Sequence, residues 1–231
     1  MSGAVLGIDT ATAVTAVAVT DSGEVLAEER TGPGGDGRPR HGPALMGLVE
    51  SAVGVAGGWG RIDRIAVGIG PGSFTGLRIG VATARALAQG RGLGLTGVES
   101  TAALARAIGE AEPGSASLAV IDARRGEVFA AIAPAGEPAG EPVVGPAEEL
   151  GEVLEGIPGA LAAGDGSVRF RAQIEALGAR VAADDDPVHR ISARHVCLLG
   201  AEAPADPGRD VRPLYLRRPD AERWRERDGS N

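Results

Sequence analysis

The residues best placed to do chemistry lie in two short turns. Asp9 and Thr10 follow an apolar run at the expected end of a strand. A carboxylate and a hydroxyl at that point could position Mg²⁺ and phosphate groups, because Mg²⁺ prefers carboxylate oxygens and water. Gly164 and Gly166 stand between an expected strand and an expected helix, where the backbone could approach a nucleotide closely. Both turns also have a purely structural interpretation, as turn-stabilising residues, and the sequence leaves the two open.

A phosphate site built from two hairpins would need a second Asp-x-Gly turn. The corresponding stretch reads Ile-Asp-Ala-Arg-Arg-Gly at 121–126, with Arg124 in place of the glycine. The bulk of Arg124 argues against phosphate binding, and we expect Arg124 and Asp122 to form a structural or interface ion pair. An ATP-dependent phosphotransferase or ATPase of the sugar-kinase group is therefore the alternative hypothesis. ATP and Mg²⁺ are expected only under this alternative hypothesis or at the interface with a partner protein.

The composition excludes several kinds of site. All 23 basic residues are arginine, so neither a Walker A loop nor a lysine Schiff base can form. The single cysteine, Cys197, excludes an internal disulfide and a cysteine-rich zinc site, and its apolar neighbours predict a buried core residue. The three histidines are not spaced as a helix-borne metal pair, and His41 is expected to be exposed at a loop–helix junction. These observations predict no metal site.

The remaining bulk properties concern partners and location. The formal charge of −8 does not attract nucleic acid to the protein as a whole. No signal peptide and no apolar run of membrane-spanning length is recognisable, which predicts a cytoplasmic protein without membrane contact.

The pattern of apolar runs and turns predicts the same layout twice. Three strands come first, at 4–9, 14–20 and 24–30, followed by a helix near 43–57, a strand at 64–69, a helix at 75–89, a strand at 93–97 and a helix at 99–110. The second round has strands at 117–122, 127–133, 142–144, 159–163 and 179–182, and helices at 147–155, 167–177 and 192–202. This order predicts an α/β fold of two ribonuclease H-like subdomains with mixed sheets, as in actin, sugar kinases and Hsp70. We place them at 1–112 and 113–205, the second degenerate, with a C-terminal tail at 206–231.

Two helices carry more apolar surface than a sheet can cover. The segment 66–90 reads as a buried strand, a glycine-rich turn and a helix of small residues, which Ser73 or Thr75 should cap and Gly90 should end. The helix near 43–57 is similarly apolar. Either the two helices simply pack on each other and the sheet, or they form a partner-binding surface. The candidate interface residues are Leu45, Leu48, Val49, Ala52, Ile79, Ala82, Thr83 and Ala86.

The stretch Gly-Pro-Gly-Ser-Phe-Thr-Gly-Leu-Arg-Ile-Gly at 70–80 resembles the signature of the TsaB (YeaZ) family. The resemblance continues through Gly-Ile-Asp-Thr at 7–10, the segment 121–128, Gly-Asp-Gly at 164–166 and Arg-Pro-Leu-Tyr-Leu-Arg at 212–217. It covers nearly the whole chain in the expected order.

The resemblance implies a role in tRNA modification. TsaB proteins are the dimerisation subunits of the bacterial system that makes threonylcarbamoyladenosine at position 37 of tRNA. The family's partners would be TsaD, which is catalytic, and the ATPase TsaE, with tRNA contacted only indirectly. The metal-binding histidines of TsaD have no counterpart in the segment 98–104. The resemblance therefore implies a non-catalytic subunit, with no catalytic residue and no cofactor of its own. The family also implies that the two apolar helices pair with those of TsaD, and that a homodimer can form through the same surface when TsaD is absent.

Overall fold

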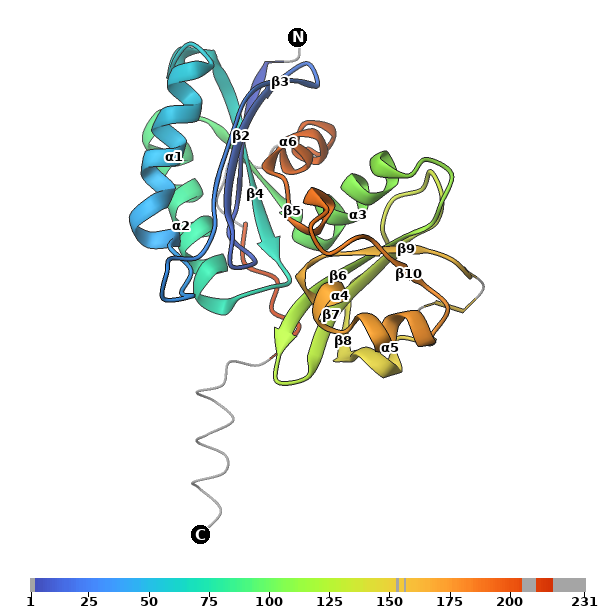
Figure 1. Ribbon diagram of the computed structural model, residues 1–231. Coiled ribbons are helices and arrows are strands. Elements are labelled where there is room, and N and C mark those ends of the chain that lie inside the picture. Colours follow the sequence, from blue (N-terminus) through green and yellow to red (C-terminus); the bar gives the residue numbers. More distant parts are fainter. Residues whose placement is uncertain (1–2, 153, 156, 205–210, 218–231) are drawn as a thin grey trace.

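The protein folds into two lobes, each built on a five-stranded sheet (Figure 1). The computed structural model describes residues 3–152, 154, 155, 157–204 and 211–217. The first sheet has the order β3-β2-β1-β4-β5 and the second the order β10-β9-β6-β7-β8. Read from the opposite edge, the second order repeats the first, so the predicted duplication is confirmed.

The first lobe contains β1 (Ala4–Asp9), β2 (Thr15–Asp21), β3 (Glu24–Thr31), α1 (His41–Val55), a 3-10 turn at Trp59–Arg61, β4 (Ile62–Gly70), α2 (Phe74–Arg91) and β5 (Gly94–Glu99). The first three strands form an antiparallel meander, because a tight turn at 22–23 joins β2 to β3. β4 and β5 then add in parallel, each after a helical crossover. Helices α1 and α2 lie side by side on one face of this sheet (Figure 1).

The second lobe contains β6 (Ser117–Arg124), β7 (Glu127–Ala133), β8 (Val143–Pro146), β9 (Leu161–Ala163), α4 (Asp165–Arg169), α5 (Arg171–Ala176) and β10 (Arg180–Val181), with 3-10 turns at Ala147–Glu149 and Pro187–His189. Its last two strands are only three and two residues long. The prediction of a reduced second copy is confirmed in this respect.

Each lobe receives one helix from the other half of the sequence. Helix α3 (Ser100–Ala111) follows β5 in the chain but packs on β6 and β7, whereas α6 (Ala193–Glu202) comes late in the chain and packs on β1, β2 and β4. The two helices also contact each other between the sheets (Figure 1). Because the lobes interlock in this way, the division between residues 112 and 113 stays a prediction. Most of the predicted tail at 206–231 lies outside the described residues.

Small residues allow α6 to lie unusually close to the first sheet. A methyl group on Gly7 of β1 would meet the Cys197 sulfur at 2.5 Å, and one on Gly200 would meet the Ala66 side chain of β4 at 2.4 Å. Cys197 is fully buried, as predicted, and its thiol donates to the carbonyl oxygen of Val5 at 3.3 Å. Because interiors are packed as densely as crystals, these positions leave no room for a larger side chain.

Three local predictions were wrong. The expected helix at 147–155 is only the short turn Ala147–Glu149 in the described residues, consistent with the glycine and proline content that follows. The expected helix at 167–177 is broken at Phe170 into α4 and α5. Helix α2 continues past Gly90 and ends at Arg91, and the following residue, Gly92, adopts φ 67° and so supplies the left-handed cap.

Candidate functional site

Asp9 ends β1 as predicted, but its carboxylate points into the protein. One oxygen accepts a hydrogen bond from the Ser100 hydroxyl at 2.7 Å, and the other accepts from the Ala11 backbone N–H at 2.8 Å. Burial raises the pKa of Asp9 to about 6, against the lowering effect of these two hydrogen bonds. The side chain thus joins the end of β1 to the first turn of α3, the helix that packs on the other lobe.

Thr10 and the glycines of α2 form one close contact. The Thr10 hydroxyl donates to the Gly76 carbonyl oxygen at 2.8 Å. A methyl group on Gly76 would meet the Thr10 carbonyl oxygen at 2.1 Å, and one on Gly80 would meet the Thr10 hydroxyl oxygen at 2.3 Å. Ser73 caps α2 by accepting a bond from the Gly76 N–H at 3.3 Å. The glycines at 72, 76 and 80 are therefore explained by the approach of α2 to residues 10–11.

His41 is also part of this junction. It is buried, in contrast to the exposed position predicted for it. Its Nδ1 is hydrogen-bonded to the Thr15 hydroxyl at 2.8 Å, and burial lowers its pKa. The first residue of α1 is thereby fixed to β2.

The turn at 164–167 packs against β6. Gly164 has φ 118°, and a methyl group there would lie 1.9 Å from the Val120 carbonyl oxygen. A methyl group on Gly166 would lie 2.9 Å from the Ile121 carbonyl carbon. Asp165, between them, accepts a hydrogen bond from the Asp122 N–H at 2.9 Å. Close packing on the strand accounts for both glycines.

The predicted ion pair at the second hairpin is present. Arg124 contacts the Asp122 carboxylate at 3.2 Å, and Arg169 contacts the same carboxylate at 2.8 Å. Arg124 and Arg125 both adopt positive φ, 65° and 58°, in the β6–β7 turn.

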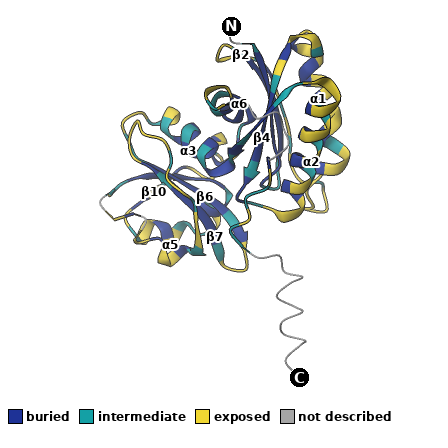
Figure 2. Ribbon diagram, turned by 180° about the vertical axis from the view of Figure 1, so that it is seen from behind, coloured by how far each residue is buried: buried dark blue, intermediate teal, exposed yellow. Residues whose placement is uncertain are grey.

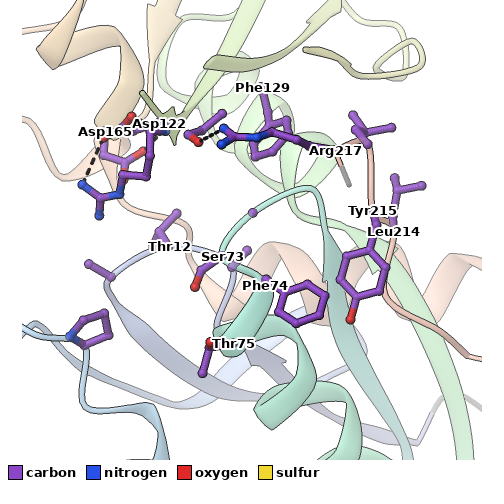
Figure 3. A pocket seen from close by; sticks show the side chains of 17 residues that line it. Thr12, Ser73, Phe74, Thr75, Asp122, Phe129, Asp165, Leu214, Tyr215 and Arg217 are labelled. Carbon is purple, nitrogen blue, oxygen red and sulfur yellow. Dashed lines mark hydrogen bonds and ion pairs between the residues drawn. The ribbon is translucent and has the colours of Figure 1, made fainter. Parts of the chain in front are cut away.

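A cleft of about 290 Å³ opens between the lobes (Figure 3). The first lobe contributes residues 11–13, Pro39 and 72–75, and the second contributes residues 122–124, Phe129 and Asp165. Asp9, Thr10, Gly164 and Gly166 do not line it. The structure therefore places the four predicted nucleotide-binding residues beneath the cleft walls instead of on them.

The segment 214–217 forms the remaining wall and ties the lobes together. The Leu214 N–H donates to the Ile69 carbonyl oxygen of the first lobe at 2.7 Å. The Tyr215 ring packs on Phe74 with centroids 4.9 Å apart (Figure 3). Arg217 donates to the Ala123 carbonyl oxygen at 2.9 Å and contacts Glu127 at 3.0 Å in the second lobe. Sequence reasoning did not single out this contact, although Tyr215 is the only tyrosine and Phe74 one of three phenylalanines in the chain.

The candidate interface residues divide into two groups. Leu45, Val49 and Ala52 are at most 1% exposed and belong to the core beneath α1, so their side chains face the sheet. Ala82 and Ala86 are exposed, while Leu48, Ile79 and Thr83 are partly exposed. Figure 2 shows that the exposed side of α1 and α2 faces away from the rest of the molecule. We define this outer face by Met46, Gly47, Leu48, Gly54, Val55, Arg78, Ile79, Ala82, Thr83, Arg85 and Ala86.

Comparison with known proteins identifies the family. The model of the TsaD family, described as tRNA N6-adenosine threonylcarbamoyltransferase, matches residues 37–183. The tRNA threonylcarbamoyladenosine biosynthesis protein TsaB of Escherichia coli is 36% identical over 126 residues, which cover 54% of this chain and 52% of that protein. The chain belongs to the TsaB (YeaZ) branch of the TsaD family. The match thus spans about half the length of this curated TsaB, whereas the uncharacterized protein Rv3421c of Mycobacterium tuberculosis is 35% identical across 94% of this chain and 93% of its own length.

Solved structures agree with this assignment and with the fold predicted from the sequence. A Pseudomonas aeruginosa protein described as similar to the peptidase YeaZ superposes with a TM-score of 0.77 at 25% identity, covering 94% of this chain and 100% of that one. The ROK hexokinase of Thermus thermophilus superposes with a TM-score of 0.54 at 14% identity, covering 87% of this chain and 100% of that one, and shows the shared actin-like and sugar-kinase fold. TsaB proteins and this chain thus share the duplicated architecture.

The described residues contain neither a metal-binding cluster nor a membrane-spanning helix. No group of three or more His, Cys, Asp or Glu side chains is placed to hold a metal ion. None of the helices in residues 3–204 combines the length and apolarity needed to cross a membrane.

Proposed function

We propose that this chain is a non-catalytic subunit of the machinery that makes threonylcarbamoyladenosine in tRNA, and that it binds TsaD through the outer face of α1 and α2. In this proposal TsaE joins the complex as the ATPase, and tRNA is engaged indirectly through TsaD. When TsaD is absent, the same face forms a homodimer.

The outer face itself carries the proposal. Met46 and Val55 of α1 are 41% and 67% exposed. Gly47 and Gly54 lie on the same face of α1, and a methyl group on either would meet nothing within 4 Å. Glycine inside a helix costs about 1 kcal/mol relative to alanine. Because the folded chain does not require these two glycines, close approach of a partner helix is the simplest physical reason for them.

The burial of Asp9 and Thr10, which were predicted as possible nucleotide-binding residues, supports the proposal that the subunit is non-catalytic. The Asp9 carboxylate is enclosed by the Ser100 hydroxyl and the Ala11 N–H. The Thr10 hydroxyl is used to hold α2. A phosphotransferase would need such groups directed into its cleft, in contact with substrate or metal.

The proposal is tested by co-purification with TsaD from the same organism. We expect the two proteins to elute as one complex at micromolar concentration, and Ala82→Glu to separate them by introducing a charge at the centre of the face. Ala135→Glu, at an exposed loop position of the second lobe, is the matched control and should leave the complex intact. Separate elution of the wild-type proteins would refute the proposal. Depletion of this chain in cells should remove threonylcarbamoyladenosine from tRNA, and expression of wild type or of A135E should restore it.

An ATP-dependent phosphotransferase or ATPase remains the second candidate because the cleft of about 290 Å³ lies between lobes that share the fold of a ROK hexokinase. Calorimetric titration with Mg-ATP decides between the two. Binding heat at millimolar nucleotide that Asp9→Asn abolishes would favour the phosphotransferase, and the absence of heat would remove it.

A further inference from the structure

Helix α2 has an unusual charge composition. It carries Arg78, Arg85 and Arg91 and no Asp or Glu, in a chain whose formal net charge is −8. Within the part of the chain that the structure describes, none of the three guanidinium groups has a carboxylate within 4.0 Å. Arg78 lies over the Phe74 ring at 5.1 Å and Arg91 over the Trp59 ring at 3.7 Å. The Arg85 side chain makes neither a hydrogen bond nor an ion pair with any described residue.

This differs from the pattern elsewhere in the molecule. Nine other arginines form ion pairs with carboxylates among the described residues: Arg38, Arg61, Arg106, Arg124, Arg169, Arg171, Arg180, Arg194 and Arg217. The described part of the protein thus has many carboxylates that pair with arginines, but none of them lies within 4.0 Å of a guanidinium group of α2. Arg78 and Arg85 are therefore exposed cations without a carboxylate partner among the described residues.

The positions of these cations relate them to the outer face. Arg78 and Arg85 are seven residues apart, which is about two helical turns, so they lie in one row along α2. Both are exposed and flank Ala82, whereas Arg91 lies at the C-terminal end of the helix against Trp59. The row of Arg78 and Arg85 therefore borders the apolar centre of the outer face.

A second copy of the chain is a poor complement to this row. In a two-fold dimer the same patch faces itself. Each copy would bring Arg78 and Arg85 against a single carboxylate on α1, that of Glu50, so the joined surface would hold an excess of positive charge. Guanidinium groups that lose water without gaining a carboxylate weaken an interface.

We propose that the outer face of α1 and α2 selects a protein partner that places carboxylates opposite Arg78 and Arg85, in preference to a second copy of this chain. This rests on the proposed function and specifies the chemistry of the partner surface. The homodimer is then the weaker assembly, and the two assemblies respond to salt in opposite directions. Screening removes attraction in the first and repulsion in the second.

The test compares three proteins: wild type, the double variant Arg78→Glu with Arg85→Glu, and the control Arg91→Glu. The control changes charge on the same helix at a position off the outer face. Affinity for TsaD is measured by calorimetry at 50 and 500 mM NaCl. We expect the double variant to bind about thirtyfold more weakly than wild type, because two lost pairs and two like-charge contacts of about 0.5 kcal/mol each add to about 2 kcal/mol. The Arg91→Glu protein should stay within about twofold of wild type, and salt should weaken wild-type binding. Binding of the double variant within twofold of wild type would overturn the inference.

Measuring self-association of this chain tests the same inference without TsaD. By sedimentation equilibrium, wild-type dimerisation should strengthen as salt rises from 50 to 500 mM. A mixture of wild type and the double variant should form mixed dimers more readily than wild type forms homodimers, since opposite charges then face each other. Wild-type dimers that weaken with salt, or a mixture that gains no mixed dimer, would overturn the inference. Failure of wild type to bind TsaD would instead refute the proposed function, and the self-association arm would still decide the charge inference.

Discussion

Replacing Asp9 with asparagine should remove a pH dependence from the stability of the fold. The pKa of Asp9 in the folded state is about 6, above its ordinary value of 3.8. Between these two values the folded protein keeps a proton that the unfolded chain has lost, so stability falls as pH rises through this window. About two pKa units correspond to about 3 kcal/mol at neutral pH, since one unit is about 1.4 kcal/mol. Burial of Asp9 is complete, so solvent does not screen this cost.

Asparagine has nearly the same shape and carries no charge. Its oxygen can accept from the Ala11 N–H, and its amide can donate to the Ser100 hydroxyl, which rotates to accept. We therefore expect Asp9→Asn to be more stable than wild type by up to about 3 kcal/mol at pH 7.5 and nearly equal to it near pH 4.

Urea unfolding between pH 4 and 7.5 measures this directly, as the difference between variant and wild type at each pH. The difference isolates Asp9, because other shifted groups such as His41 and His195 are common to both proteins. Asp63→Asn, which removes an exposed carboxyl on β4, is the matched control for the loss of one carboxylate. The structural account of Asp9 is refuted if Asp9→Asn is less stable than wild type at pH 7.5, or if Mg-ATP stabilises wild type but not the variant.

Three further outcomes follow from packing. Gly47→Ala should stabilise the isolated chain by about 1 kcal/mol in urea unfolding, because the helix gains propensity and the methyl group enters open space, yet it should weaken TsaD binding measured in parallel. Gly7→Ala should destabilise the fold by about 1–3 kcal/mol in thermal unfolding, since its methyl group would collide with Cys197 and Ala193. The Cys197 thiol, whose pKa burial raises to about 12, should fail to react with a thiol reagent at pH 8 in the native state and react at once in urea.

The strands and long helices could be predicted because each is fixed by local pattern. The strand at Ala4–Asp9 and the helix at Phe74–Arg91 were placed within two residues of their observed bounds. The exchange of α3 and α6 between lobes could not be predicted, since it depends on contacts such as that of Gly7 with Cys197, which are 190 residues apart in the sequence. Helix propensity could have shown that the segment after Ala147 forms only a short turn, because glycine and proline recur in it.

The position of Asp9 at the end of a strand could be predicted, but the direction of its side chain could not. The turn at Asp9 does lie beside the cleft, yet periodicity cannot say whether a strand-end carboxylate points out or in. That is decided by Ser100, which comes from a helix 91 residues later. Similarly, an amphipathic pattern marked α1 as apolar but could not separate Leu45, which faces the sheet, from Leu48 beside it, which is partly exposed. Orientation becomes clear only when the partners of each side chain are known.

The glycines separate what the monomer needs from what it does not. On α2, Gly76 and Gly80 are required by Thr10, because any larger residue would push the helix off the end of β1. On α1, Gly47 and Gly54 meet no atom of the folded chain, and each reduces helix stability. Contacts with Thr10 therefore account for Gly76 and Gly80 of the 70–80 motif without any ligand. Gly47 and Gly54 need a cause outside the monomer. We infer that this face of α1, where two glycines lower helix stability and contact no other residue, is a binding surface. The apolar residues beside these glycines favour another protein as the bound neighbour.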